Sequence, residues 1–166
     1  MRTLSFYAFI FLLGVAFAQA VYYFPVMPDP MTSHFGFYGQ ADGWMSKNGF
    51  FIFEAGLFLL MILSFIVMPW AFEKYRVRAG INMPNKDYWL APERIEYFYS
   101  HFRESFCWFG VVTLVLLVGT MQMTFAANLQ ANPVLDMRKF LVLLGGYLLF
   151  TAIWTISFYR KFNKVE

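Results

Sequence analysis

Four polar side chains lie in the first third of an otherwise apolar chain and could take part in chemistry. His34, Asp42 and Lys47 occupy the segment 25–49, and Glu54 follows within an apolar run. One imidazole, two carboxylates and one ammonium group could together bind a cation, a polar headgroup or a peptide. We therefore predict that these four residues form a ligand-binding site.

Each residue of the segment 25–49 also has a structural interpretation. His34 could bond loop carbonyls at the membrane surface, and Asp42, which precedes Gly43, could make a turn. Lys47 could anchor the outer end of the following apolar run by reaching toward lipid headgroups. No second histidine and no cysteine stands near His34 in the sequence. We therefore predict no metal site, because structural zinc requires four protein ligands.

Glu54 is the only charged residue in the apolar run 48–72. An unpaired charge costs about 2.5–3.5 kcal/mol at the centre of a spanning helix, so we expect Glu54 to have a partner. The candidate partners are His34, Lys47, Gln122 and Asn128. In one interpretation Glu54 closes a polar site beneath the loop. In the other it is a neutral acid, hydrogen-bonded to Gln122, that supports helix packing.

The rest of the chain predicts the frame that holds these residues. Of the 166 residues, 60% are hydrophobic, 22% aromatic and 14% charged, whereas soluble domains average about 25% charged residues. A hydrocarbon core of about 30 Å needs about 20 apolar residues in a helix. Four runs meet this length, at about 4–24, 50–72, 106–127 and 140–159. We predict an all-α membrane protein of four transmembrane helices, folded as a single integral membrane domain over residues 1–166.

The first run could instead be a signal peptide, because Ala18-Gln19-Ala20 fits a cleavage site of small residues. Val21 to Phe24 extend the run and complete a full span. We therefore expect a retained helix.

Positive charges predict the orientation of the spans. Of the 13 Lys and Arg residues, all but Lys47, Arg138 and Lys139 lie on the side of the two termini and of the loop 73–105. Such residues concentrate in cytoplasmic loops. We therefore expect both termini and the loop 73–105 in the cytoplasm, and the loop 25–49 outside.

An amphipathic segment precedes the third run. Ile95, Phe98, Phe102 and Phe106 recur at spacings of three or four residues and make one apolar face of a helix. Pro92 suits the start of such a helix. We predict an amphipathic interfacial helix that runs on into the third transmembrane helix.

The loop 25–49 also resembles the signature of a known family. It contains Met27-Pro28-Asp29-Pro30, followed by His34, Gly39, Asp42 and Lys47. A second similar segment reads Met83-Pro84-Asn85-Lys86-Asp87-Tyr88-Trp89 and continues as Ala91-Pro92-Glu93-Arg94. On these motifs the chain is identified as a member of the domain-of-unknown-function family 1648 (DUF1648), whose members are bacterial and archaeal integral membrane proteins. It departs from the family pattern at the proline before the histidine, because Pro30 stands four residues before His34.

The best understood members of the family that this chain resembles are the SdpI-like membrane proteins. These proteins give immunity to a secreted peptide toxin and help to signal its presence. The resemblance implies a place in a bacterial or archaeal cytoplasmic membrane and an immunity-like or sensing-like role. Our first hypothesis is a membrane protein that recognises a polar ligand or a peptide at the outer membrane surface. The alternative is a non-catalytic accessory subunit of a larger membrane complex.

Other function classes are disfavoured by the residues. One exposed histidine with scattered acids makes no nucleophile–base pair, so we expect no enzyme and no cofactor. The net charge of +3 is not gathered in one basic block, which argues against nucleic acid as a partner. The expected partners are membrane lipids and either a protein partner or further copies of this chain.

Overall fold

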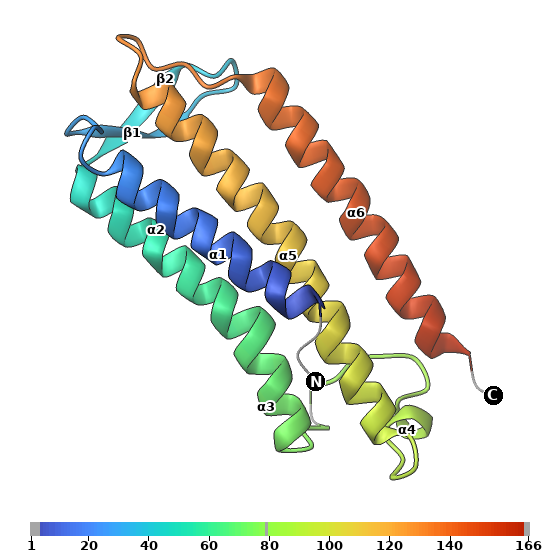
Figure 1. The fold of residues 1–166 in the computed structure, drawn as a ribbon. Helices are drawn as coiled ribbons and strands as arrows, with labels where there is room; N and C mark the ends of the chain where they lie inside the picture. The colour runs from blue at the N-terminus through green and yellow to red at the C-terminus, as the bar shows by residue number, and fades with distance from the viewer. Residues whose placement is uncertain (1–3, 79, 165–166) are drawn as a thin grey trace.

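Within the described residues, four long helical rods run along the molecule (Figure 1). The computed structural model describes residues 4–78 and 80–164. The rods are α1 (Leu4–Tyr23), the continuous run of α2 (Lys47–Ile62), η1 (Leu63–Val67) and α3 (Met68–Lys74), α5 (Ile95–Asn128) and α6 (Met137–Asn163). The remaining elements are the strands β1 (Met31–Phe35) and β2 (Ala41–Met45) and the short helix α4 (Lys86–Trp89).

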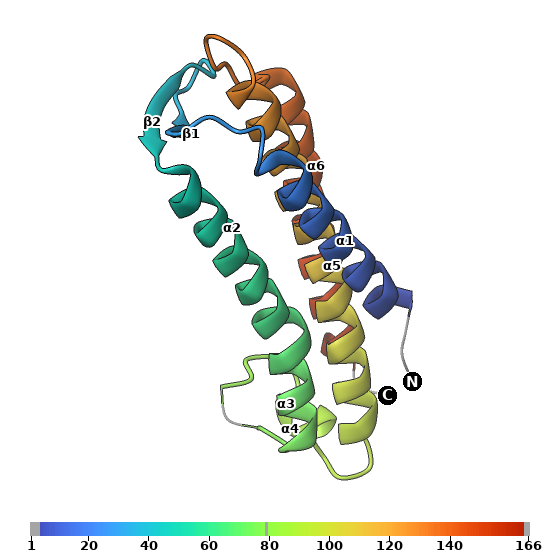
Figure 2. The ribbon, with the colours of Figure 1, turned by 60° about the vertical axis from the view of Figure 1, so that its left-hand side comes forward.

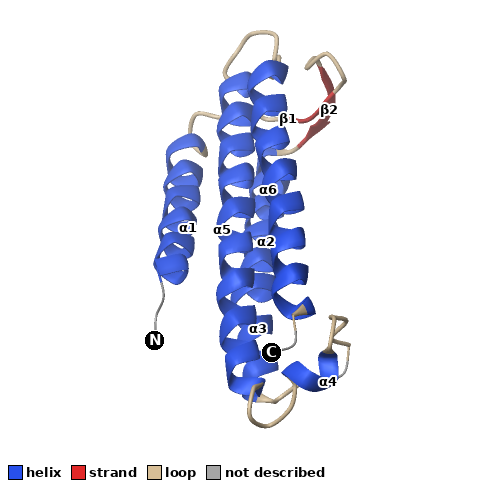
Figure 3. Ribbon diagram, turned by 90° about the vertical axis from the view of Figure 1, so that its right-hand side faces the viewer, coloured by secondary structure: helices blue, strands red, loops and turns tan. Residues whose placement is uncertain are grey.

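All four rods are long and apolar enough to cross a bilayer, which confirms the predicted membrane protein of four spanning helices. The 34 residues of α5 make a helix about 51 Å long, so α5 extends well beyond a hydrocarbon core of about 30 Å. The strands and the α5–α6 connection lie together at one end of the bundle, and α4 lies at the other (Figures 1, 2 and 3). We call these the hairpin end and the α4 end.

The predicted outer loop contains a β-hairpin, so the structure is not purely α-helical. The strands β1 and β2 pair antiparallel, with Met31 opposite Met45 and His34 opposite Gly43. Gly39 takes a φ of +86° in the connection, and its N–H donates to the carbonyl of Gly36 at 2.8 Å. A residue with a side chain rarely adopts such a φ, which explains the glycine in this tight turn.

The second rod contains a stretch of π-helix just before Pro69. Proline has no N–H, so the carbonyl four residues earlier loses its usual donor. In η1 the backbone widens instead, and the N–H of Met68 donates to the carbonyl of Leu63, five residues back. The rod thereby continues without a break from Lys47 to Lys74. Single π-helical turns of this kind commonly accommodate irregularities inside α-helices.

Three apolar clusters hold the rods together. The first joins α1 to the second rod and to α5 around Phe9 and Leu114, which are both fully buried. The second lies beneath the hairpin, where Met31 packs near Phe125 of α5. The third lies at the α4 end around Phe162 of α6. Apolar packing therefore links the rods at three levels of the bundle.

The apolar face predicted for an interfacial helix is used inside the molecule. Ile95, Phe98 and Phe102 are buried, and they pack against Met83 and Leu90 of the connection between α3 and α5. The amphipathic segment is continuous with the third span, because α5 runs unbroken from Ile95 to Asn128. Contact of this segment with a membrane surface stays a prediction.

Candidate functional site

The hairpin brings His34 and Asp42 together. The Nδ1 atom of His34 and the Oδ1 atom of Asp42 are 2.5 Å apart across the two strands. Gly43 makes this approach possible, because a Cβ at that position would lie 2.9 Å from the Cβ of His34. The two side chains are 73% and 47% exposed. The turn interpretation of Asp42 is wrong, since this residue lies within β2 and its carboxylate binds the imidazole.

A buried amide on α5 holds the hairpin in place. The N–H of Thr32 donates to Oδ1 of Asn128 at 2.7 Å, and Nδ2 of Asn128 donates to the carbonyl of Thr32 at 3.0 Å. A second attachment joins the turn to the α5–α6 connection, where the N–H of Leu135 donates to the carbonyl of Gly39 at 2.8 Å. A Cβ on Gly39 would lie only 2.4 Å from the carbonyl oxygen of Leu135. The hairpin is therefore fixed to the bundle at two points.

Lys47 is used to fasten the chain that enters the hairpin. Its N–H donates to Oδ1 of Asp29 at 3.1 Å, and its Nζ atom donates to the carbonyl of Met27 at 3.4 Å. The same ammonium group lies 5.1 Å from the centre of the Phe24 ring. Ser46 caps the start of α2 by accepting from the N–H of Gly49 at 3.1 Å. Lys47 is thus half-buried by its own neighbours rather than held by the His34–Asp42 pair.

Glu54 is buried in the second rod without a hydrogen-bond partner among the described residues. Its side chain is 2% exposed, and neither carboxylate oxygen contacts a donor. It lines a cavity of about 280 Å³ between α1 and α2, whose other walls are apolar and include Ala16, Phe17 and Phe58. Phe17 is 72% exposed, so this wall also faces the surroundings of the bundle. Glu54 is therefore the one acidic residue in the wall of an otherwise apolar cavity.

The partners expected for Glu54 bind elsewhere. Gln122 accepts from Nε2 of Gln19 at 2.9 Å and donates to the Tyr23 hydroxyl at 2.6 Å. Asn128 is committed to the hairpin and to the carbonyl of Thr124. Among the described residues, the predicted hydrogen bond between Glu54 and Gln122 is therefore absent.

The four predicted site residues occupy two separate places. His34 and Asp42 lie on the hairpin, with Lys47 at the start of α2. Glu54 lies seven residues further along α2, about 10 Å deeper at 1.5 Å per residue. Apolar side chains such as Phe50 pack between the hairpin and the interior. Within the described residues, the structure thus provides an exposed imidazole–carboxylate pair and a deeper carboxyl-lined cavity.

Two aromatic residues at the tip of the hairpin were not singled out from the sequence. Phe37 and Tyr38 are 85% and 79% exposed, and their ring centres are 5.2 Å apart. Large aromatic rings are favoured where a membrane meets water. The sequence did contain a sign of this hairpin tip, because Gly36 and Gly39 flank the two aromatic residues.

An apolar cavity with one carboxyl group can select its ligand by charge. A carboxylate buried without a partner is unfavourable, and an ammonium or guanidinium group that enters the cavity would neutralise it. A protonated carboxyl could instead donate a hydrogen bond to a carbonyl oxygen. The first interaction is the stronger, because both groups carry charge. The chemistry of this cavity therefore favours a cationic group attached to an apolar body.

Comparison with known proteins finds one family that the first part of the chain matches. Residues 10–63 match the family described as a domain of unknown function (DUF1648), which confirms the resemblance over this stretch. The match covers most of α1, the hairpin and all of α2, including all four predicted site residues. No curated protein and no solved structure matches the chain.

Proposed function

We propose that this integral membrane protein recognises an amphiphilic, cationic peptide at the membrane face that carries the hairpin. The observation that carries the proposal is the Glu54 carboxyl, which is buried, has no partner among the described residues and lines an apolar cavity. Ionisable groups inside spanning segments commonly mark functional sites. A lysine or arginine side chain of the peptide would give Glu54 the partner that the chain itself does not provide.

The size of the cavity supports a side chain as the group that enters. Pockets that enclose a drug-sized ligand measure about 300–1,000 Å³. The cavity between α1 and α2, at about 280 Å³, suits one long side chain whose parent molecule stays outside. Its wall includes the exposed Phe17, so a ligand could reach Glu54 from the lipid.

The hairpin supplies groups for a first contact at the surface. Phe37 and Tyr38 project from its tip, and the His34–Asp42 pair lies on the strands beside them. Rings bind the apolar face of an amphiphilic peptide, while the pair can exchange hydrogen bonds with polar groups. His34, Asp42 and Lys47 would then act at the surface, and Glu54 would act deeper along the same helix.

The cellular role we propose is protection against a membrane-active peptide, or detection of it. The DUF1648 match over α1, the hairpin and α2 is compatible with this role. The distribution of Lys and Arg favours the cytoplasmic membrane of a bacterium or archaeon as the location, with both termini and the α4 end inside the cell. The hairpin end would then meet the secreted peptide.

A binding measurement on a matched pair of variants tests the proposal. The protein is reconstituted in nanodiscs of zwitterionic phosphatidylcholine, and a synthetic leucine–lysine amphipathic peptide is titrated while native mass spectrometry counts bound peptides. We expect Glu54→Gln to weaken binding about tenfold, because a charged hydrogen bond contributes about 1.5–3 kcal/mol. Glu93→Gln removes the same charge from an exposed position outside the cavity and should stay within about twofold of the parent.

The comparison can contradict the proposal in two ways. Equal binding by the parent and by Glu54→Gln would show that the carboxyl group does not recognise the peptide. An equal loss of peptide binding in Glu93→Gln would show that binding depends only on the overall charge of the protein. A further readout is survival of cells exposed to a peptide toxin, in which His34→Ala, Asp42→Ala and Glu54→Gln should each reduce protection at equal expression.

The surface of α6 favours a second candidate function, that of an accessory subunit. None of the residues in the apolar stretch of α6 is buried, although the helix packs on α5 through rings such as Phe109 and Trp154, 4.8 Å apart. Val142 and Leu149 are 73% and 63% exposed. A helix of another protein could pack on this face. Gentle extraction followed by native mass measurement separates the two: a stoichiometric partner favours the accessory subunit, and a lone chain or homodimer favours peptide recognition.

A further inference from the structure

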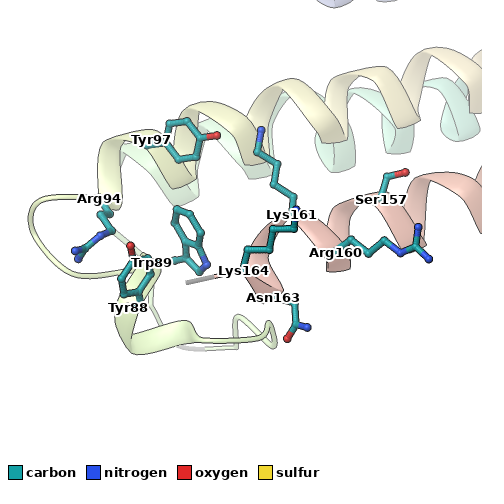
Figure 4. Close-up of a pocket in the computed structure, with 9 residues that line it drawn as sticks. All are labelled: Tyr88, Trp89, Arg94, Tyr97, Ser157, Arg160, Lys161, Asn163 and Lys164. Carbon is teal, nitrogen blue, oxygen red and sulfur yellow. The ribbon is translucent and has the colours of Figure 1, made fainter. Parts of the chain in front are cut away.

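A second cavity lies at the α4 end, far from Glu54 and the hairpin. It measures about 1070 Å³ and is lined by α4, the start of α5 and the last turns of α6. Figure 4 shows Tyr88, Trp89 and Tyr97 on one side, with Lys161 of α6 and Lys164, which follows α6, on the other. The residues of this cavity come from segments far apart in the sequence, so only the folded chain brings them together.

The charged groups of this cavity are all positive. Its lining includes four cations and no acidic residue: Arg94, Arg160, Lys161 and Lys164. None of the four forms an ion pair with an acid in the described part of the chain. Arg76 and Arg103, outside the cavity, are each paired with a glutamate. No acid of the described residues therefore neutralises the cations of this cavity, and Nζ of Lys161 donates to Nδ1 of His101 at 3.2 Å.

Aromatic contacts fix the shape of the cavity. Nε1 of Trp89 donates to the carbonyl of Phe162 at 2.8 Å, which ties α4 to α6. The ring of Tyr97 stacks on Trp89 at 5.9 Å between ring centres. The guanidinium group of Arg94 lies 3.9 Å from the centre of the Tyr88 ring. Because these groups are already held in place, binding an anion would order few additional side chains.

The cavity also lies at the level where lipid headgroups are expected. The apolar run 140–159 of α6 is about 30 Å long at 1.5 Å per residue, which matches the hydrocarbon core. Arg160, Lys161 and Lys164 follow directly after this run. The flanking tyrosines and tryptophan are residue types that gather at this level of a membrane.

We propose that Lys161 and Lys164, which lie beside Trp89 at the α4 end, bind the phosphate group of an anionic phospholipid. Basic pockets beside spanning helices bind anionic headgroups, because phosphate oxygens accept several charged hydrogen bonds at once. Such binding is distinct from the proposed recognition of a peptide, since it uses the opposite end of the bundle. A bound lipid would brace α6 against α4 and the start of α5, which Trp89 already joins.

The test measures lipid selectivity directly. The full chain is purified in mild detergent, and native mass spectrometry records the binding of phosphatidylglycerol and of phosphatidylcholine with identical acyl chains. We expect the parent to bind phosphatidylglycerol at least about tenfold more tightly, because each Lys or Arg near an anionic surface contributes about 1 kcal/mol. Lys161→Gln with Lys164→Gln should abolish that preference. Arg138→Gln with Lys139→Gln removes two charges at the hairpin end and should keep it.

The remaining results would overturn the proposal. Equal binding of the two lipids by the parent excludes selection of an anionic headgroup. Loss of the preference in the variant of Arg138 and Lys139 would show that net charge, rather than this cavity, selects the lipid. Titration with glycerol phosphate tests a soluble source of the same phosphate chemistry. Displacement of phosphatidylglycerol by equimolar glycerol phosphate would show that the cavity binds a soluble phosphate compound instead of a lipid.

Discussion

Asn128 and Thr32 are joined by a pair of hydrogen bonds, in which the side-chain amide of Asn128 contacts both the N–H and the carbonyl of Thr32. The two residues are 96 positions apart, and both are buried, at 4% and 1% exposed. The amide thus forms the same two kinds of hydrogen bond with β1 that the backbone of a neighbouring strand would form. It fixes the direction in which the hairpin leaves the bundle, and with it the place of the His34–Asp42 pair.

We predict that Asn128→Ala loosens the hairpin while the spanning helices stay folded. The change leaves the N–H and the carbonyl of buried Thr32 without partners, which costs about 1–3 kcal/mol for each unsatisfied group. Hydrogen–deuterium exchange should become faster over residues 31–45 and stay unchanged in the centre of α5. Gln130→Ala removes an exposed amide two residues away and serves as the control. Unchanged exchange in the hairpin would contradict the anchoring role.

Replacement of Glu54 by leucine should stabilise the protein and abolish peptide binding. The carboxyl group is buried without a partner, so an apolar side chain of similar size removes an unfavourable burial of about 1–3 kcal/mol. The stabilisation is checked by a titration with a denaturing detergent, in which the midpoint of unfolding should rise. The loss of binding is checked by the titration with the leucine–lysine peptide. Destabilisation by Glu54→Leu would mean that the carboxyl group supports the fold, and the binding proposal would lose its basis.

The His34–Asp42 pair should contribute little to stability. Both side chains are substantially exposed, and exposed ion pairs contribute about 0–1 kcal/mol. We expect His34→Ala and Asp42→Ala to leave the unfolding midpoint close to that of the parent. A double-mutant cycle on thermal unfolding measures the coupling between the two residues. A coupling well above 1 kcal/mol would show that the pair holds the hairpin together, which would weaken the case for a role in binding.

The spanning helices could be predicted from the sequence because the requirement on them is local. A helix that crosses lipid needs an uninterrupted apolar run, and this property is visible in any 20 consecutive residues. The helix ends were less predictable, since polar residues extend the rods. Lys47 begins α2 three residues before the predicted span, where Ser46 supplies the cap.

The hairpin and the partners of Glu54 depend on contacts between distant residues, which no local pattern reveals. The strands have five residues each, and β1 depends on Asn128 for its position. The environment of Glu54 is set by how α1 and α2 are rotated about their axes. The rotation of α1 turns Gln19 and Tyr23 toward Gln122 of α5, and the rotation of α2 places Glu54 in the wall of an apolar cavity.

The amphipathic segment before the third span illustrates a different limit. Its periodicity correctly indicated a helix with one apolar face. Periodicity does not say what covers that face, and lipid was expected. The structure covers it with Met83 and Leu90 of the preceding connection and with Phe162 of α6. The same folding of the connection creates the basic cavity around Trp89, which for this reason could not be inferred from the sequence.

The start of α6 should depend on pH through Asp136. This carboxylate accepts from the N–H of Lys139 at 3.1 Å and pairs with its ammonium group, and these bonds lower the pKa of Asp136 below its ordinary value of 3.8. The stabilisation is fully present above pH 3.8 and is lost as the pH falls through the lowered value. Amide exchange at residues 137–140, corrected for intrinsic rates, should rise only in that acidic range. Asp136→Asn should remove the pH dependence of this exchange.

Gly110 should be the glycine least tolerant of a side chain among those inside the spanning helices. An added Cβ would lie 2.7 Å from the Cβ of Phe65 and 2.8 Å from the ring of Phe9, so α1, η1 and α5 would have to move apart. Overpacking of this kind costs about 1–3 kcal/mol, and we expect Gly110→Ala to lower the unfolding midpoint accordingly. Gly146→Ala adds the same methyl group to α6 where no atom lies within 4 Å, and it should leave the midpoint unchanged or raise it. Equal midpoints for the two variants would show that α1, η1 and α5 do not pack closely at Gly110. The position of α1, whose residues form one wall of the Glu54 cavity, would then have to be revised.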